Sequence, residues 1–126
     1  ADLVAMALPG TRETNNFLSR ERIALMKKTA FLINVGRGNA IDQDALIEAL
    51  EEEKIAGAAL DVFRQEPIPQ DDPIWRAKNL IITPHCSGQM TLAYTRDTLV
   101  DLFCKNLTRF CGGQPLLHQV DKNQAY

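Results

Sequence analysis

Four short, nearly continuous apolar runs, separated by polar segments, constrain the fold of this sequence more than any other feature. They occupy residues 3–8, 30–35, 58–60 and 79–83. Each run is too short for an ordinary helix, and none alternates between apolar and polar residues as a strand with one solvated face would. Continuous apolar strands are typical of a parallel sheet covered on both faces by helices. The sequence therefore predicts an α/β fold with a parallel, three-layer, Rossmann-type sheet.

Helix signals fall between and after these runs. Ser19 and Asp42 stand where N-cap residues belong, so we expect a short helix that ends near Lys27-Lys28 and a second helix that ends near Glu52. Asp72-Pro73 predicts a single helical turn around Trp75. The longest helix is expected from about Thr91 to Phe110, before Gly112-Gly113.

Size and charge exclude several classes of protein. The chain has 126 residues, of which 45% are apolar, and this is enough for one domain with a buried core. The net charge of −2 gives no basic footprint for nucleic acid. No apolar run approaches the roughly 20 residues that span a bilayer. The three cysteines form no C-x-x-C pair, which favours a reduced, cytoplasmic compartment. Because the sequence opens without Met on a strand-like run, we expect a piece of a longer protein.

Charged residues collect where the expected strands end. In an open parallel sheet, ligands bind in the crevice at the carboxyl ends of the strands. The second run leads into Gly36-Arg37-Gly38, the third ends at Asp61 and the fourth leads into Pro84-His85. Glu66 lies on the loop that follows Asp61. The sequence therefore predicts that Arg37, Asp61, Glu66 and His85 meet at one edge of the sheet.

These four side chains suit the reduction of a 2-keto acid by a hydride donor. The fork of donors on Arg37 fits a carboxylate, and the flanking glycines let a ligand or another backbone come close. His85 could act as a general acid or base, with Glu66 fixing its tautomer and stabilising the charged ring. Asp61 would be free to accept a hydrogen bond from an amide. Each residue also has a plainer interpretation, as a surface arginine, a structural histidine, a solvated carboxylate or the cap of a turn.

Four motifs, in this order and spacing, resemble the D-isomer-specific 2-hydroxyacid dehydrogenases. They are Leu8-Pro9-x-Thr11-x-x-Thr14, Asn34-x-x-Arg37-Gly38, Asp61-Val62-Phe63-x-x-Glu66-Pro67-x-Pro69 and Thr83-Pro84-His85-x-Ser87-Gly88. The resemblance extends from residue 1 to about residue 110. It implies that residues 1–88 are the second half of a doubly wound NAD(P)-binding domain. Residues 89–126 would then be a long helix and tail that return to a substrate domain.

The resemblance also implies a role for each site residue. Arg37 would bind the substrate carboxylate and polarise its carbonyl, His85 would donate the proton, and Glu66 would be the partner of His85. Asp61 would contact the nicotinamide carboxamide. The positions that would line NAD or NADP are Leu8, Pro9, Thr14, Val35, Gly36, Arg37, Asp61, His85, Ser87 and Gly88. The implied partner is a small 2-keto or 2-hydroxy acid, as in glyoxylate and hydroxypyruvate reductases, and no metal site is expected.

One departure from the family pattern limits what this chain can do alone. The G-x-G-x-x-G fingerprint that holds the dinucleotide pyrophosphate is absent, as is the residue that chooses between NAD and NADP. We therefore expect an incomplete domain that is inactive by itself, binds NAD(P) very weakly or not at all, and forms a homodimer to cover an open sheet edge or apolar face.

Two other functions stay open at this stage. Some relatives are corepressors that sense the nucleotide while keeping the same residues, so a binding module remains an alternative to an enzyme. A free-standing signalling domain is the third class. That class would need a phosphoacceptor aspartate after the first strand, and here the strand ends in Leu8-Pro9.

Overall fold

A computed structural model describes residues 1–88, 90 and 92–122 of the chain. The chain divides into two compact units, Ala1–Ser87 (unit 1) and Gly88–Tyr126 (unit 2). The elements of unit 1 are β1 (Leu3–Met6), α1 (Arg20–Ala24), β2 (Phe31–Asn34), the 3-10 helix η1 (Gly38–Ala40), α2 (Gln43–Glu51), β3 (Gly57–Leu60), the 3-10 helix η2 (Pro73–Arg76) and β4 (Leu80–Ile82). Unit 2 contains α3 (Ala93–Cys111).

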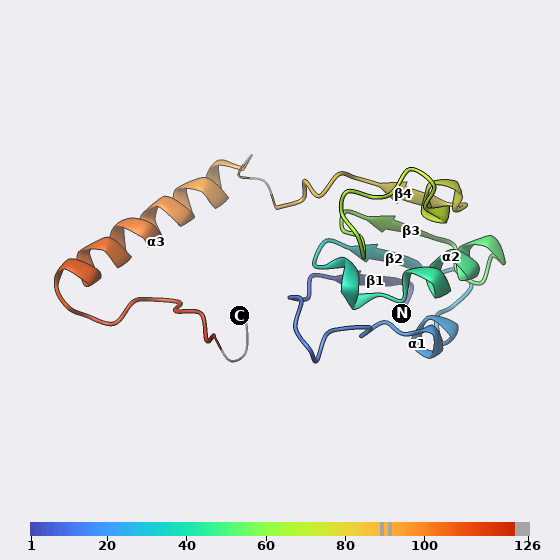
Figure 1. Cartoon of the computed structure of the whole chain (residues 1–126), viewed down its shortest axis with the longest axis horizontal. Coiled ribbons are helices and arrows are strands. Elements are labelled where there is room, and N and C mark those ends of the chain that lie inside the picture. Colours follow the sequence, from blue (N-terminus) through green and yellow to red (C-terminus); the bar gives the residue numbers. More distant parts are fainter. Residues whose placement is uncertain (89, 91, 123–126) are drawn as a thin grey trace. The chain divides into compact units, whose positions relative to one another are not determined.

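The four strands form one parallel sheet in the order β1-β2-β3-β4 (Figure 1). Their last residues are in register, because Met6 pairs with Asn34, Asn34 with Leu60 and Leu60 with Ile82. The expected α/β fold with a parallel, Rossmann-type sheet is therefore confirmed. The segments that leave the four strands all begin at the same edge, which is where the candidate site residues lie.

Within unit 1, helices cover one face of this sheet and not the other. On the covered face, Leu32 and Leu60 are buried with Leu46 and Leu50 of α2 in a single hydrophobic core. On the opposite face, Phe31 is 52% exposed and Ile81 is 66% exposed. Within unit 1 only one face is covered, so the three-layer arrangement is incomplete, as expected for half of a doubly wound domain. The strands form continuous apolar runs because this second face is apolar as well.

The second helix begins and packs as its sequence indicates. The Asp42 side chain accepts a hydrogen bond from the Ala45 backbone N–H at 3.0 Å, which satisfies a group that has no partner inside the helix. One side of α2 is buried along its length, as the helical spacing of its apolar residues predicts; these residues are Ala45, Leu46, Ala49 and Leu50. This stripe orients α2 on the sheet, and with it the loops that begin at the functional edge.

The first helix is shorter than predicted. It ends at Ala24, because Leu25 and Met26 donate their N–H groups to carbonyls three residues back, a tightening typical of helix ends. Lys27, expected near the last turn, instead places its ammonium 2.9 Å from an Asp2 carboxylate oxygen. Ser19 is the N-cap residue by position, but its hydroxyl donates to Glu21 and not to the backbone.

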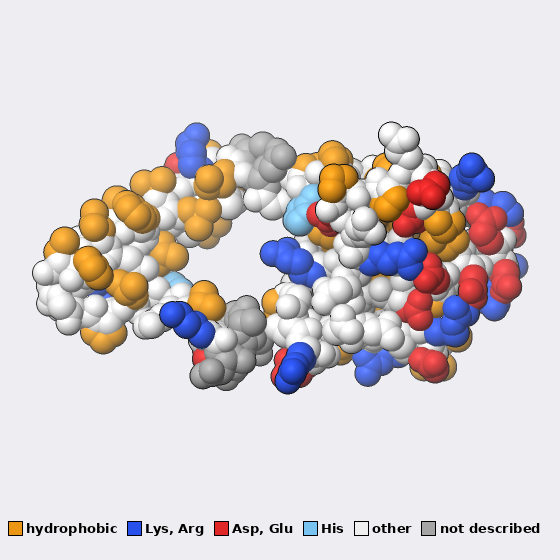
Figure 2. Space-filling model, in the orientation of Figure 1, with side chains coloured by type: hydrophobic (Ala, Val, Ile, Leu, Met, Phe, Trp, Pro, Cys, Tyr) orange, Lys and Arg blue, Asp and Glu red, His pale blue; other side chains and the backbone are white. Residues whose placement is uncertain are grey.

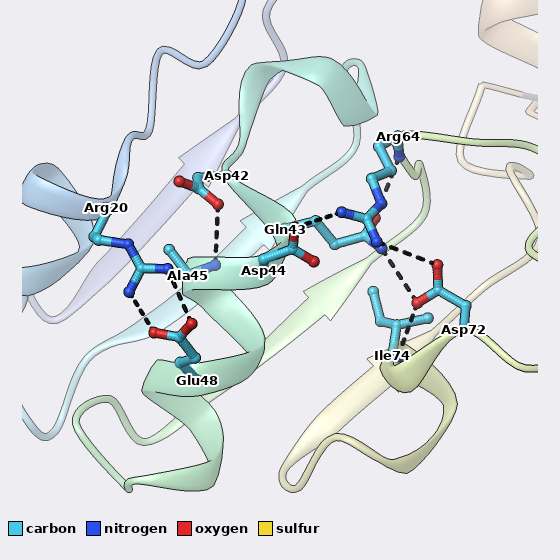
Figure 3. Close-up of polar contacts among 9 residues, drawn as sticks. All are labelled: Arg20, Asp42, Gln43, Asp44, Ala45, Glu48, Arg64, Asp72 and Ile74. Atoms are coloured by element: carbon cyan, nitrogen blue, oxygen red, sulfur yellow. Dashed lines mark hydrogen bonds and ion pairs between the residues drawn. The ribbon is translucent and has the colours of Figure 1, made fainter.

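A charged network ties the loop after β3 to α2 and η2 (Figure 3). The Arg64 guanidinium lies 2.7 Å from Asp44 and 3.7 Å from Asp72, while its backbone N–H donates to the Gln43 side chain at 3.3 Å. Asp72 in turn accepts the Ile74 N–H at 2.9 Å, which caps the predicted turn. Exposed ion pairs stabilise a fold by at most about 1 kcal/mol each, so the main effect of this network is to fix the path of the loop that carries Glu66.

The helix of unit 2 has an apolar stripe, and the described residues of that unit include no buried core for it to pack on. No residue of α3 is buried, and Leu99, Phe103 and Phe110 are exposed. Figure 2 shows hydrophobic side chains along the surface of this helix. The helix ends at Cys111, close to the predicted end, whereas the predicted start at Thr91 lies outside the described residues. Among the helices that the structure describes, none is long and apolar enough to cross a membrane.

Candidate functional site

The turn after β2 brings Arg37 to the carboxyl edge of the sheet. Buried Asn34 shapes this turn, because its Nδ2 donates to the Arg37 carbonyl at 3.0 Å and its Oδ1 accepts the Gly36 N–H at 3.0 Å. A Cβ on Gly36 would lie 2.6 Å from the backbone of Leu8, and a Cβ on Gly38 would lie 1.9 Å from the carbonyl carbon of Phe63. The glycines were expected to let either a ligand or another backbone come close. The structure shows that neighbouring backbone comes close at both positions.

The Arg37 guanidinium is exposed at this edge. It donates one hydrogen bond, from Nη1 to the Gly36 carbonyl at 2.8 Å, and within the described part of the chain it forms no ion pair with a carboxylate. A guanidinium carries five N–H donors, so most of them remain for a ligand. Nothing joins Arg37 directly to Glu66 or His85 in the described residues. The cation is thus placed to bind an anion that comes from outside the chain.

Glu66 and His85 form a hydrogen-bonded pair on the loops after β3 and β4. Oε2 of Glu66 lies 2.6 Å from Nδ1 of His85, and Oε1 accepts the Phe63 N–H at 2.8 Å. Partial burial would raise the pKa of the Glu66 carboxyl, but the hydrogen bonds from His85 and Phe63 outweigh it and lower that pKa. Since Nδ1 faces the carboxylate, Nε2 is the ring nitrogen that can face a substrate.

Asp61 accepts hydrogen bonds from the segment that follows β4. Its side chain is 3% exposed and accepts hydrogen bonds from the Thr83 hydroxyl, from Cys86 N–H at 2.9 Å and from Ser87 N–H at 2.8 Å. Burial alone would raise the pKa of this carboxyl, but the donors of Ser87, Thr83 and Cys86 hold it well below its usual range. Both Asp61 oxygens thus already accept hydrogen bonds from the chain itself, and the expectation that Asp61 also accepts from an amide of the cofactor stays a prediction.

Within unit 1, the residues expected to line a cofactor lie in the segments that follow the strands, and they differ in exposure. Pro9, Val35 and Ser87 are exposed, while Leu8 is half-buried. The Thr14 hydroxyl donates to the Pro9 carbonyl and accepts the Thr11 N–H at 2.8 Å, so it holds the turn that follows β1. Gly88 is the first residue of unit 2, and an added Cβ there would meet nothing within 4 Å.

Sequence reasoning missed several residues that build this edge. Asn34 and Thr83 were seen as parts of motifs without a structural role, and the N–H of Phe63 as the anchor of Glu66 was not foreseen. A polar asparagine at the end of an otherwise apolar strand was a usable signal, because a buried amide must find partners. No comparable local signal marks the backbone N–H groups of Phe63, Cys86 and Ser87.

A pocket of about 730 Å³ lies beside the Glu66–His85 pair. Its other lining residues are mostly apolar: Phe63, Pro67, Ile68, Trp75, Ile82, Thr83 and Pro84. Trp75 is half-exposed, and its indole N–H donates to the Pro69 carbonyl at 2.8 Å. In the part of the chain that the structure describes, no three His, Cys, Asp or Glu side chains cluster as ligands for a metal ion.

Comparison with known proteins adds a family and several relatives. Residues 1–87 match the family model described as D-isomer specific 2-hydroxyacid dehydrogenase, NAD binding domain. The glyoxylate reductase of Korarchaeum cryptofilum (strain OPF8) is 41% identical over 114 residues, which are 90% of this chain and 34% of that protein. The chain thus spans about a third of the length of the curated relatives that it matches.

Two solved structures resemble the whole chain. A D-isomer specific 2-hydroxyacid dehydrogenase from Xanthobacter autotrophicus Py2, in complex with NADPH and MES, has a TM-score of 0.87 and 37% identity over 100% of this chain and 50% of that one. An NADPH-dependent glyoxylate/hydroxypyruvate reductase from Sinorhizobium meliloti, in complex with NADP and sulfate, has a TM-score of 0.83 and 28% identity over 100% of this chain and 40% of that one.

Proposed function

Because this chain belongs to the D-isomer specific 2-hydroxyacid dehydrogenase family, we propose that it is part of an NAD(P)-dependent oxidoreductase that interconverts a 2-keto acid and a 2-hydroxy acid. The observation that carries the proposal is the Glu66–His85 pair, joined at 2.6 Å on the sheet edge that also bears an exposed Arg37. Relatives named glyoxylate reductase and glyoxylate/hydroxypyruvate reductase favour a small 2-keto acid as the substrate.

The proposed chemistry assigns the proton to His85. A nicotinamide cofactor, when bound, supplies a hydride to the carbonyl carbon of the keto acid. His85 gives the proton on Nε2 to the carbonyl oxygen, so that the hydroxy acid carries both the hydride and the proton. Glu66 keeps Nδ1 protonated and stabilises the imidazolium before the proton leaves. In the reverse direction the neutral ring accepts the hydroxyl proton.

Arg37 is proposed to hold the substrate. Its planar guanidinium can donate two parallel hydrogen bonds to a carboxylate, which fixes the position of the adjacent carbonyl. The same cation stabilises the negative charge that develops on the carbonyl oxygen during reduction. The exposure of Arg37, and the absence of an ion pair for it among the described residues, support this role.

The residues present fit one end of a dinucleotide. Exposed Pro9 and Val35, beside half-buried Leu8, give an apolar rim at the carboxyl edge of the sheet, as an aromatic nicotinamide ring requires. The pyrophosphate cradle G-x-G-x-x-G is not in this sequence. We therefore assign Leu8, Pro9, Thr14, Val35, Gly36, Ser87 and Gly88 to the nicotinamide end only. NADPH is the first cofactor to test, since it is named with a related structure.

The proposal also covers the domains and the oligomeric state of the whole enzyme. Residues 1–88 are the second half of an NAD(P)-binding domain, and residues 89–126 lead to a substrate domain in a longer, cytoplasmic enzyme. The exposed apolar side chains Leu3, Phe31 and Ile81 on the uncovered face of the sheet support a homodimer or a neighbouring segment that buries them.

Turnover by the full-length enzyme tests the function. Glyoxylate, hydroxypyruvate, pyruvate and a bulkier keto acid are each assayed with NADH and with NADPH, for the native enzyme and for His85→Gln. We expect reduction of at least one small keto acid by the native enzyme and a loss of roughly 10²-fold or more in the variant. Cofactor binding without turnover of any keto acid would overturn the enzyme assignment in favour of a nucleotide-sensing module.

A further inference from the structure

We propose that Asp61 is a positioning residue for His85, because its buried carboxylate organises the turn from Thr83 to Ser87. The inference rests on the proposed function only for the importance of His85 itself. The sequence assigned Asp61 to the cofactor, and nothing in that assignment concerns the geometry of the histidine. The role follows from the contacts of the carboxylate on either side of His85.

The Asp61 carboxylate holds the chain both before and after His85. Before it, the Thr83 hydroxyl donates to Oδ1. After it, Cys86 N–H donates to Oδ1 at 2.9 Å and Ser87 N–H donates to Oδ2 at 2.8 Å. The Cys86 thiol lies 3.6 Å from the same Oδ1. A single buried group at the end of β3 therefore fixes three of the residues that surround the proposed proton donor.

The conformation of His85 needs such support. Its φ is +50°, in the left-handed region that residues with a side chain rarely adopt, and its N–H donates to the Thr83 carbonyl at 3.0 Å. A residue in this region keeps its conformation only when the surrounding structure holds it there. The anchors at Thr83, Cys86 and Ser87 supply that constraint from both directions along the chain.

The partner of His85 is tied to the same segment. Glu66 Oε1 accepts the N–H of Phe63, which follows Asp61 by two positions in the sequence, and Oε2 meets His85 Nδ1 at 2.6 Å. Asp61 thus holds the turn that carries His85, and the loop that follows Asp61 holds the Glu66 side chain through the Phe63 N–H. Displacing the turn would lengthen the Glu66–His85 hydrogen bond even though Asp61 forms no hydrogen bond with either side chain in the described structure.

The arrangement needs a carboxylate and not an amide. The backbone N–H groups of Cys86 and Ser87 can only donate, and they meet different oxygens of Asp61. An asparagine offers one oxygen and one NH₂ group. Its oxygen can accept from one backbone N–H, but its NH₂ group then faces the other N–H, and two donors form no hydrogen bond. The hydroxyl of Thr83 can rotate to accept, but a backbone N–H cannot. Asp61→Asn therefore keeps the shape of the side chain and releases one end of the turn.

The tautomer of His85 in this chain tests the proposal without any assay of activity. The sequence contains only two histidines, so His118 serves as the internal reference. Long-range ¹⁵N–¹H spectra are recorded at about pH 8, above the ordinary titration range of histidine. We expect native His85 to carry its proton on Nδ1, toward Glu66. Asp61→Asn should convert this single form into a mixture, while the signals of His118 stay unchanged.

Two further variants separate positioning from general loss of stability. Leu50→Ala opens the buried core away from the turn, and it should destabilise unit 1 while leaving the His85 tautomer as in the native chain. Thr83→Val removes one donor only and should shift the tautomer partly, which keeps the test decisive if Asp61→Asn does not fold. An unchanged His85 tautomer in a folded Asp61→Asn chain, or in Thr83→Val where only that variant folds, would overturn the proposal. The full-length enzyme could still reduce keto acids in that case. Failure of the Asp61 proposal is therefore distinguishable from failure of the proposed function.

Discussion

The carboxylate of Glu66 joins two loops, because Oε2 lies 2.6 Å from Nδ1 of His85 while Oε1 accepts the Phe63 N–H at 2.8 Å. The hydrogen bond to the backbone limits how far the carboxylate can turn, so its second oxygen stays directed at the ring. A glutamate held in this way can stabilise a charged imidazole and fix its tautomer without moving during a reaction.

Replacing Glu66 by Gln should shift the pH profile of the proposed reaction. The pKa of Glu66 is lowered by its hydrogen bond to His85, so the group is ionised at neutral pH and favours the protonated ring. Without this charge, keto-acid reduction should fail at a lower pH, and hydroxy-acid oxidation should begin at a correspondingly lower pH. Both directions are measured as kcat/KM against pH in the full-length enzyme.

The control for this experiment is Glu52→Gln, an exposed glutamate that pairs with Lys54 beyond the end of α2. That variant should leave both profiles as in the native enzyme. If Glu66→Gln also leaves both profiles unchanged, then Glu66 is not the partner of the proton donor.

Replacing Arg37 by Lys should impair catalysis with little effect on folding. A lysine keeps the charge but cannot donate two parallel hydrogen bonds to a carboxylate. We expect kcat/KM to fall by the equivalent of roughly 2–4 kcal/mol, as for the loss of an oxyanion donor. Thermal unfolding should hardly change, because the guanidinium donates only to the Gly36 carbonyl in the described structure. Arg76→Lys, at an exposed position in η2, is the matched control, and near-native kcat/KM in Arg37→Lys would contradict the assignment.

The parts of the fold that sequence predicted correctly depend on local signals. Asp42 caps α2 through an N–H only three residues away, and the stripe of α2 repeats within a few turns. The strand ends were predictable to within about two residues, because each apolar run stops at a proline, a glycine or an aspartate. Parallel pairing then places all four ends at one edge, and this is why Glu66 and His85, 19 residues apart, could be expected to meet.

The parts that were missed depend on contacts between distant segments. The donors to Asp61 come from residues 22 to 26 positions later, and they reach it only because Leu60 pairs with Ile82. Lys27, expected near the last turn of α1, pairs instead with Asp2, which is 25 residues away. Neither relationship leaves a mark within a short window of sequence. The exposed second face of the sheet likewise depends on which elements unit 1 contains.

The buried charge on Asp61 should make unit 1 sensitive to acid. Its folded pKa lies below its unfolded value, so its contribution to stability is present above about pH 4 and is lost as the pH falls toward the folded pKa. Between about pH 4 and pH 2, the free energy of unfolding should therefore fall less in Asp61→Asn than in the native chain. Its slope against pH should be smaller by up to roughly 1.4 kcal/mol per pH unit. Urea unfolding at several pH values measures the slopes. Equal slopes would show that Asp61 does not hold its charge in the folded chain.

Gly38 should tolerate no side chain. A Cβ there would lie 1.9 Å from the carbonyl carbon of Phe63 and 2.5 Å from its Cα, so the backbone of two loops would have to separate. We expect Gly38→Ala to lower the free energy of unfolding by about 3 kcal/mol or more, at the upper end of overpacking effects. Gly88→Ala is the control, since an added Cβ there meets no atom within 4 Å. Equal unfolding midpoints for the two variants would mean that the turn after β2 is more open than described.

The 126-residue chain alone should bind NADH or NADPH very weakly, if at all, and should pair with a second copy. A dinucleotide pyrophosphate normally rests on glycine-rich backbone at a helix N-terminus, and the sequence lacks the G-x-G-x-x-G that forms it. Dimerisation is expected because the uncovered face of the sheet exposes Phe31 and Ile81. Calorimetric titration with both cofactors tests the first part, and equilibrium sedimentation tests the second.

A matched pair of variants identifies the surface that drives this association. Ile81→Ser removes an apolar side chain from the uncovered face and should weaken dimerisation by roughly tenfold, the effect of losing about 1.4 kcal/mol of apolar burial. Leu25→Ser changes a side chain that is 84% exposed but lies after α1, outside the sheet, and it should leave the dimer intact. Micromolar cofactor affinity from a strict monomer would contradict both parts, since it would mean that the chain already contains a complete cradle and a sheet that needs no cover.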